Sequence, residues 1–406
     1  MTKIGFHYFP DTKHYRRQDL EIWIPRLKAL GVTWLTLLAP TSYAIPEYFL
    51  EGLMKSGITP LLHFPFRLDQ VPNRKDFNLL SHTYARQGVE YLILFNKPNL
   101  RSQWGAISWS KSNLVERFLD AYLPLAEETL KAGMHPVFPP LAQGGDYWDI
   151  SFLRTALEGL QRRGDPRLVD HMILSVDANP NGHPLHWGQG GPECWPQAQP
   201  YFTPPNSEDH RGFRIIDWYL IITQATLGKN VPTFMLNLGE EKDEKAYQKD
   251  SKIVNLLNHK KVPKLEPLPS EVKAGMFWLL AADQEDENLT HAWFKPNGEN
   301  HPMVERKHES PGLQNKHKPA VRLKHYLVLP TYDGQVTDWH LEIIRGFVKT
   351  HKPTIGFSLE EAAYARQVTI IGGEDQYPKS DIDKLRAKGC RVRQITGSGT
   401  DIASQL

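Results

Sequence analysis

The chain has 406 residues, more than a single hydrophobic core usually serves, so we expect more than one domain. Hydrophobic residues make up 40% of it and aromatic residues 11%, which is typical of globular proteins and excludes a disordered chain. The 48 basic and 46 acidic residues nearly cancel, so the composition gives no support to a nucleic-acid partner.

Cysteine content and hydropathy exclude two further classes. Cys194 and Cys390 fall in what we expect to be different domains, so we predict neither a disulfide framework nor a zinc-ligand pattern. No run of about 18 apolar residues occurs, so we predict no membrane-spanning helix. The first residues, MTKIGFHYFP, lead directly into a strand pattern without a signal-peptide pattern. The compartment stays open between the cytoplasm and, if a leader is missing from this sequence, the outside of the cell.

Short apolar runs alternate with longer amphipathic stretches, as in parallel βα units. Asp19 is the expected N-cap of the first helix. Gly31, Gly57 and Gly88 each end a helix just before an apolar strand. In the first half we expect strands over 4–9, 32–39, 58–66 and 89–96, and helices over 19–31, 46–57, 77–88 and 112–133.

The second half repeats this order. We expect strands over 134–142, 170–178, 231–239 and 272–282, and helices over 149–164, 212–228 and 244–258. Eight such units predict a closed (β/α)8 TIM barrel over residues 1–298. A doubly wound open sheet is the alternative.

In such a barrel, function lies on the loops that follow the strands. Aromatic and polar side chains gather in these loops, and this combination suits a sugar, because rings stack on its apolar faces while polar groups bind its hydroxyls. We therefore predict a carbohydrate ligand bound by His7, Tyr8, His63, Asn96, Trp104, Asp146, Trp148, His186, Trp187, Trp195, Tyr201 and Trp293.

Several of these residues come from one long loop, 181–202, with the sequence NGHPLHWGQGGPECWPQAQPYF. A loop of this length inside a compact domain is usually functional. We predict that it forms a sugar-binding wall through His186, Trp187, Trp195 and Tyr201. The alternative is a rigid cover that packs on its own rings.

Three motifs resemble the large clan of retaining glycoside hydrolases built on TIM barrels: FNKPN at 95–99, GGDYWDISFL at 144–153 and THAWFKPNG at 290–298. The resemblance covers roughly residues 1–300. It implies a glutamic acid that protonates the leaving group after strand four and a glutamate nucleophile at the end of strand seven. These positions fall on Lys97 and on or near Asn237. Lysine is a poor substitute for a glutamic acid of raised pKa, and asparagine forms no stable glycosyl ester. We therefore predict a carbohydrate-binding barrel with impaired catalysis, a pseudoenzyme.

Other carboxylates keep an active glycoside hydrolase open as the alternative. Asp177 ends strand six and Asp283 follows strand eight, and inverting hydrolysis tolerates carboxylates about 6.5–9.5 Å apart. Glu240 or Glu241 takes the nucleophile's place if strand seven ends later than expected, although acids at a helix start also favour its dipole. Asp149 fits a helix N-cap better than a catalyst. The histidines form no HExxH-like pair, so we predict no metal and no cofactor.

Residues 299–324 are charged, punctuated by proline and without periodicity, which predicts a linker. Residues 325–406 alternate four short strands with helices, which predicts a small open parallel α/β domain. Within it, QVTIIGGEDQYPKSDIDKLRAKGCRVRQITG at 367–397 is similar to the repeats of bacterial cell-wall-binding modules. The Gly372-Gly373 turn exposes amides that suit phosphate, but the full dinucleotide fingerprint is absent. No protein partner is indicated.

Overall fold

The computed structural model describes residues 3–240, 244–299, 323–330, 338–363, 365–374, 376–397 and 399–405. The chain divides into two compact units, Met1–Ser310 and Pro311–Leu406, each of which is described by itself. Most of the predicted linker 299–324, and Glu241, lie outside the described residues. No helix among the described residues is long and apolar enough to cross a membrane.

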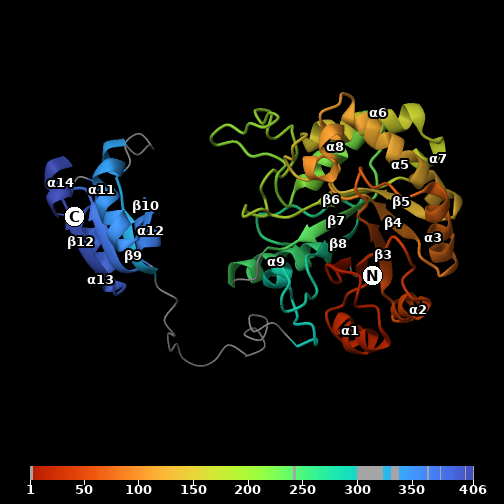
Figure 1. Cartoon of the computed structure of the whole chain (residues 1–406), viewed down its shortest axis with the longest axis horizontal. Helices are drawn as coiled ribbons and strands as arrows, with labels where there is room; N and C mark the ends of the chain where they lie inside the picture. The colour runs from red at the N-terminus through yellow and green to blue at the C-terminus, as the bar shows by residue number, and fades with distance from the viewer. Residues whose placement is uncertain are drawn as a thin grey trace. The chain divides into compact units, whose positions relative to one another are not determined.

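The larger unit is the predicted TIM barrel, in which eight parallel strands close from β1 to β8 and helices surround them (Figure 1). Its strands are β1 (Ile4–His7), β2 (Trp34–Leu38), β3 (Thr59–Phe64), β4 (Tyr91–Leu94), β5 (His135–Phe138), β6 (Ile173–Asp177), β7 (Thr233–Leu238) and β8 (Val272–Phe277). Its α-helices are α1 (Arg17–Ala29), α2 (Glu47–Lys55), α3 (Arg74–Arg86), α4 (Ala106–Trp109), α5 (Leu114–Lys131), α6 (Asp149–Arg163), α7 (Pro166–Asp170), α8 (Ile215–Leu227) and α9 (Glu244–Leu257). Short 3-10 helices occupy Arg101–Gln103 and Glu287–His291.

The start of α1 differs from the prediction. The helix begins at Arg17, and Asp19 lies in its first turn instead of at the N-cap. The Asp19 carboxylate accepts the Arg16 N–H at 2.7 Å, so it still satisfies a donor at the helix start. The predicted glycine stops are confirmed, because Gly31, Gly57 and Gly88 have φ of +68°, +78° and +86°.

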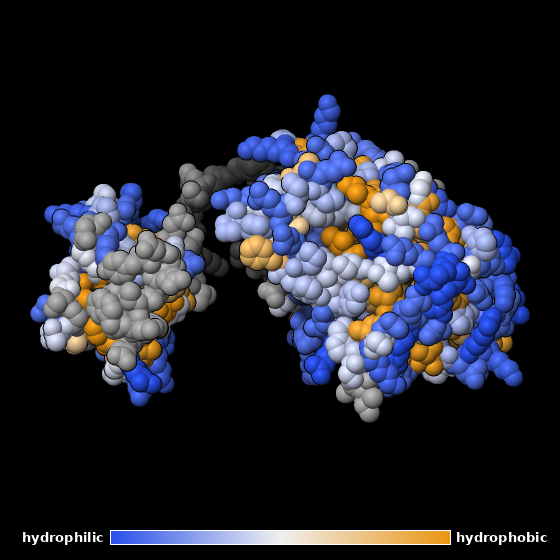
Figure 2. Space-filling model, turned by 90° about the horizontal axis from the view of Figure 1, so that it is seen from above, coloured by the Kyte–Doolittle hydropathy of each residue, from blue (hydrophilic) through white to orange (hydrophobic). Residues whose placement is uncertain are grey.

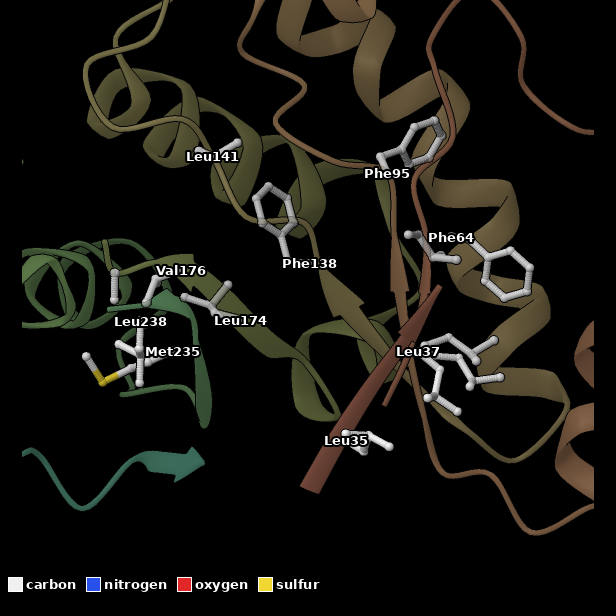
Figure 3. Packing of buried hydrophobic residues seen from close by; sticks show 14 of the residues in the cluster. Leu35, Leu37, Phe64, Phe95, Phe138, Leu141, Leu174, Val176, Met235 and Leu238 are labelled. Atoms are coloured by element: carbon white, nitrogen blue, oxygen red, sulfur yellow. The ribbon is translucent and has the colours of Figure 1, made fainter. Parts of the chain in front are cut away.

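Side-chain alternation along the strands builds two apolar layers. Leu35, Leu37, Leu174 and Val176 belong to the outer cluster, which lies between the barrel and its helices (Figure 3). The residues between them face inward, because successive side chains of a strand point to opposite faces. The inner cluster comprises Leu61, Tyr91, Ile93, Val137, Ile173, Phe234, Leu236, Ala274 and Met276, with Trp34 packed against it.

The barrel interior is filled rather than open. The rings of Trp34, Tyr91 and Phe234 contact one another with centroids 5.1–5.6 Å apart. Because three large rings and the aliphatic residues beside them occupy the interior, a ligand is expected at the loop-bearing rim and not along the barrel axis. On the face of the barrel that Figure 2 shows, most surface residues are hydrophilic, and apolar residues show as separate areas.

The smaller unit is the predicted open parallel α/β domain. Its strands β9 (Leu323–Val328), β10 (Thr354–Gly356), β11 (Ala365–Ile371) and β12 (Arg391–Ile395) pair in the order β10-β9-β11-β12. The helices α12 (Leu359–Ala362) and α13 (Lys379–Ala387) contribute to one apolar cluster. The helices α11 (Asp338–His351) and α14 (Gly399–Gln405) contribute to another. The sheet is therefore covered on both faces, as expected for parallel strands.

Candidate functional site

A cavity of about 490 Å³ lies at the carboxyl ends of the barrel strands. Each strand contributes a residue at or just after its end, as a TIM barrel requires of its functional face. The lining residues are His7, Leu38, His63, Pro65, Asn96, Lys97, Pro140, Asp177, Asn179, Asn181, Leu236, Asn237, Trp278 and His291.

Three of the predicted catalytic positions, Lys97, Asp177 and Asn237, meet in this cavity. The Lys97 Nζ lies 2.5 Å from Asp177 Oδ2, and the Asn237 Nδ2 donates to Asp177 Oδ1 at 3.1 Å. The Asp177 side chain is 7% exposed and that of Lys97 29% exposed. The lysine charge therefore compensates a carboxylate that is shielded from water.

The backbone at this cluster is unusual. Lys97 and Asn237 have φ of +48° and +57°, a left-handed conformation that typically costs about 1–3 kcal/mol in a residue other than glycine. Met235 pairs with Gly275 and Leu238 with Phe277, so β7 carries one more residue than β8 over this stretch. Such a bulge redirects side chains. It explains why the adjacent residues Leu236 and Asn237 both line the cavity.

Two buried histidines form another part of the wall. Burial, with the nearby positive charges of His63 and Lys97, lowers the pKa of His7 to about 3. Burial also lowers the pKa of His63 to about 4, although the Phe95 carbonyl oxygen, 2.9 Å from Nε2, opposes this shift. Both rings are therefore neutral at neutral pH and can donate or accept one hydrogen bond at each nitrogen. The buried His7 Nε2 has no hydrogen-bond partner among the described residues.

The structure does not bring several predicted sugar-binding residues to the cavity. Tyr8 follows the inward-facing His7 and so points outward, where it packs edge-on against Trp23 in the outer cluster. Trp104 is buried and donates to the Pro98 carbonyl oxygen at 2.8 Å. Trp293 packs on Phe6, with ring centroids 5.0 Å apart. Three of the predicted sugar-binding residues that follow strands β1 to β4 do line the cavity: His7, His63 and Asn96.

The long loop after β6 packs largely on itself. Trp187 stacks on His183 with ring centroids 4.1 Å apart and donates to Asp209 at 3.1 Å. The Trp195 ring nitrogen donates to the Gln189 carbonyl oxygen at 3.0 Å. His186 is half exposed, 3.9 Å from the Glu208 carboxylate. These contacts match the rigid-cover alternative, and none of the four predicted wall residues is among the residues that line the cavity: His186, Trp187, Trp195 and Tyr201.

The remaining predicted loop residues form a joint between two loops. The Tyr201 hydroxyl accepts the Trp148 N–H at 2.7 Å and donates to the Asp146 carbonyl oxygen at 3.1 Å. The Asp146 carboxylate accepts the Arg101 N–H at 2.7 Å. Asp146, Trp148 and Tyr201 therefore connect loops of the rim, and they do not line the cavity.

The alternative catalytic carboxylates Glu240, Asp283 and Asp149 lie outside the cavity. Glu240 accepts the Gly182 N–H at 2.7 Å and pairs with Lys249 at 2.7 Å. Asp283 lies 3.4 Å from the His14 ring nitrogen. Asp149 is the first residue of α6, not its N-cap, and its buried carboxylate binds His210 and the Tyr219 hydroxyl, each at 2.8 Å.

Eight lining residues were not predicted as site residues: Leu38, Pro65, Pro140, Asn179, Asn181, Leu236, Trp278 and His291. Trp278 follows β8, and Asn179 and Asn181 follow Asp177 by two and four residues. The sequence signal for all three is their position after a strand, a signal that the prediction assigned to neighbouring residues. Leu38 ends β2 and His291 lies in a 3-10 helix after β8. The latter has no local sequence signal.

No protein-family model and no curated protein matches this sequence. The solved structures that resemble the fold include a monomeric β-xylosidase from Caulobacter crescentus CB15, at 10% identity and a TM-score of 0.47, covering 75% of this chain and 66% of that one. A GH128 endo-β-1,3-glucanase from Sorangium cellulosum is 12% identical with a TM-score of 0.43, and the match covers 75% of this chain and 96% of that one. Xylanase 10B from Thermotoga petrophila RKU-1 is 13% identical with a TM-score of 0.43, and the match covers 76% of this chain and 95% of that one. No functional argument rests on these similarities, because one barrel fold carries many chemistries.

Proposed function

We propose that the barrel binds an oligosaccharide or polysaccharide in the cavity at the strand ends and does not hydrolyse it. The observation that carries this proposal is that Asp177 is the one carboxylate among the described residues that line the cavity. It is already held by Lys97 and Asn237.

The composition of the wall supports a neutral, hydroxyl-rich ligand. Asn96, Asn179 and Asn181 offer amide donors and acceptors, and the neutral His7 ring presents a nitrogen without a partner among the described residues. Trp278 supplies an aromatic surface that suits the apolar face of a sugar ring. The cavity volume of about 490 Å³ lies within the usual range of small-molecule sites.

The same wall argues against cleavage. Glycoside hydrolysis by paired carboxylates needs one group to protonate the leaving oxygen and a second to attack or to activate water. Glu240 and Asp283 do not line the cavity. Asp177 alone, paired with a lysine, supplies neither the proton donor nor the second carboxylate.

The test is a panel of polysaccharides and oligosaccharides measured with the wild type for binding, by calorimetry, and for release of reducing sugar. We expect at least one glycan to bind and none to be cleaved. Trp278→Ala should weaken that binding by about tenfold or more, because it removes the stacking surface. Trp195→Ala is the matched control, a tryptophan from the long loop that does not line the cavity.

The outcomes separate three readings. Release of reducing sugar by the wild type would establish hydrolysis and reject the proposal of a pure binder. Loss of binding in Trp195→Ala with binding kept in Trp278→Ala would place the ligand on the long loop, as the sequence predicted. Failure of every glycan to bind would reject the carbohydrate ligand itself.

A further inference from the structure

We propose that Asp11, His14 and Asp283 form a binding site for a divalent transition metal such as Zn²⁺, which ties the loop after β1 to the loop after β8. The ligand atoms of these three residues all lie within 4.8 Å of one another. None of the three lines the cavity described above, so this site is separate from the proposed carbohydrate site.

The distances around His14 fit a metal coordination sphere. The His14 Nε2 lies 3.4 Å from Asp11 Oδ2 and 3.4 Å from Asp283 Oδ1. With metal–ligand bonds of about 2.0–2.1 Å, the edge between two ligand atoms of a tetrahedral zinc site is about 3.3–3.4 Å. Asp283 is 46% exposed, so its side chain has room to complete the sphere, and water can take the fourth position.

The same distances fit poorly to a simple ion pair. A charge-assisted hydrogen bond from a protonated histidine to a carboxylate is about 2.7–2.9 Å long. The His14 Nε2 is shielded from solvent and forms no hydrogen bond within the described part of the chain, although two carboxylate oxygens lie equally near. A ring nitrogen with two carboxylate oxygens at equal distance is an arrangement that a shared cation stabilises.

Neighbouring contacts hold the ligand atoms in place. The His14 ring stacks on Phe9 with centroids 3.8 Å apart, which fixes the direction of Nε2. The Asp11 Oδ1 accepts the Lys13 N–H at 2.8 Å, which leaves Oδ2 for the cation. Support of this kind behind the ligands is usual in metal sites. One imidazole and two carboxylates suit zinc and its first-row neighbours better than Mg²⁺ or Ca²⁺, which prefer oxygen ligands throughout.

The position of the site suggests its effect. Strand β1 pairs with β8 to close the barrel, so this seam joins parts of the chain some 270 residues apart in sequence. A metal held by Asp11 and His14 on one side and Asp283 on the other would fasten the loops across the seam. Because it binds only the folded chain, it should stabilise the barrel by an amount that grows with the logarithm of the free metal concentration above the Kd.

The experiment uses the full chain without an affinity tag, after treatment with EDTA, and titrates it with Zn²⁺. We expect one equivalent to bind and the temperature of barrel unfolding to rise by about 3 °C or more at saturation. His14→Ala and Asp283→Asn should each weaken binding by about 100-fold and abolish the rise. His82→Ala, at an exposed histidine of α3, is the control and should leave both unchanged.

Asp283→Asn keeps the shape of an exposed side chain, so it tests the site even if His14→Ala perturbs folding. Wild-type protein that binds no Zn²⁺, or that binds it without stabilisation, would overturn the proposal. So would Zn²⁺ binding that both ligand variants retain, because other histidines would then hold the metal.

Discussion

Lys97 occupies the position where the resemblance to glycoside hydrolases places a catalytic acid, and its amine lies 2.5 Å from the buried Asp177. We predict that Lys97→Met destabilises the protein by about 1.5–3 kcal/mol, because it leaves the Asp177 charge with only the Asn237 amide as a partner. The measurement is the free energy of unfolding in urea at pH 7.5.

A second substitution tests the reason for this loss. In Lys97→Met/Asp177→Asn the buried charge is absent, so most of the lost stability should return, and the two effects should not add. If the double variant is as unstable as the sum of the two single variants, lysine contributes through packing of its alkyl chain and not through its charge.

The buried histidines predict how stability depends on pH. The pKa of His63 is about 4 in the folded protein and near 6.5 in the unfolded chain, so between these values the unfolded state binds more protons. The contribution of His63 to the free energy of unfolding is therefore at its maximum above pH 6.5. It falls by about 1.4 kcal/mol per pH unit as the pH decreases towards 4. His7, with a pKa of about 3, acts in the same direction.

Urea unfolding of the wild type and His63→Gln at pH 7.5, 6.0 and 5.0 measures this contribution. The variant should lose less stability than the wild type between pH 7.5 and 5.0. His135 and His325 also have lowered pKa values, so the difference between the two proteins, and not the wild-type curve alone, isolates His63. Parallel curves would contradict a neutral, buried His63.

At the scale of the element, periodicity was sufficient for the fold and for part of the site. The alternation that places Leu35 and Leu37 outward is visible in the sequence, and the same alternation, applied to β1, separates the inward His7 from the outward Tyr8. The prediction included both residues because it used proximity to the strand end without the direction of the side chain.

The bulge in β7 shows what a single sequence does not reveal. It places Asn237 beside Asp177, 60 residues away, and it depends on how β7 pairs with β8. The partners of Glu240 and Asp283 likewise come from other loops, so their roles could not be judged from local motifs. The long loop after β6 was recognised by its length, but whether its rings face a ligand or one another is decided by contacts such as that of Trp187 with His183.

At the scale of the whole molecule, the chain consists of two units with separate apolar cores. The barrel buries two nested layers of side chains, whereas the small domain buries a single sheet between helices. Because each core is internal to its unit, each should unfold cooperatively by itself. We therefore predict two transitions in a calorimetric scan of the full chain, with the larger enthalpy belonging to the barrel, since enthalpy scales with the number of residues.

Substitutions in the two cores identify the transitions. Val368→Ala, in the buried strand β11, removes two methyl groups and should lower the midpoint temperature of the small domain's transition only. Leu62→Ala, in β3, should lower the midpoint temperature of the barrel's transition only, because it destabilises the barrel by about 2–5 kcal/mol. A saccharide bound at the barrel cavity should raise the midpoint temperature of the barrel's transition and leave that of the small domain unchanged. If a single transition responded to both substitutions, the units would unfold together, and the small domain would then contribute to the stability of the barrel and of its site.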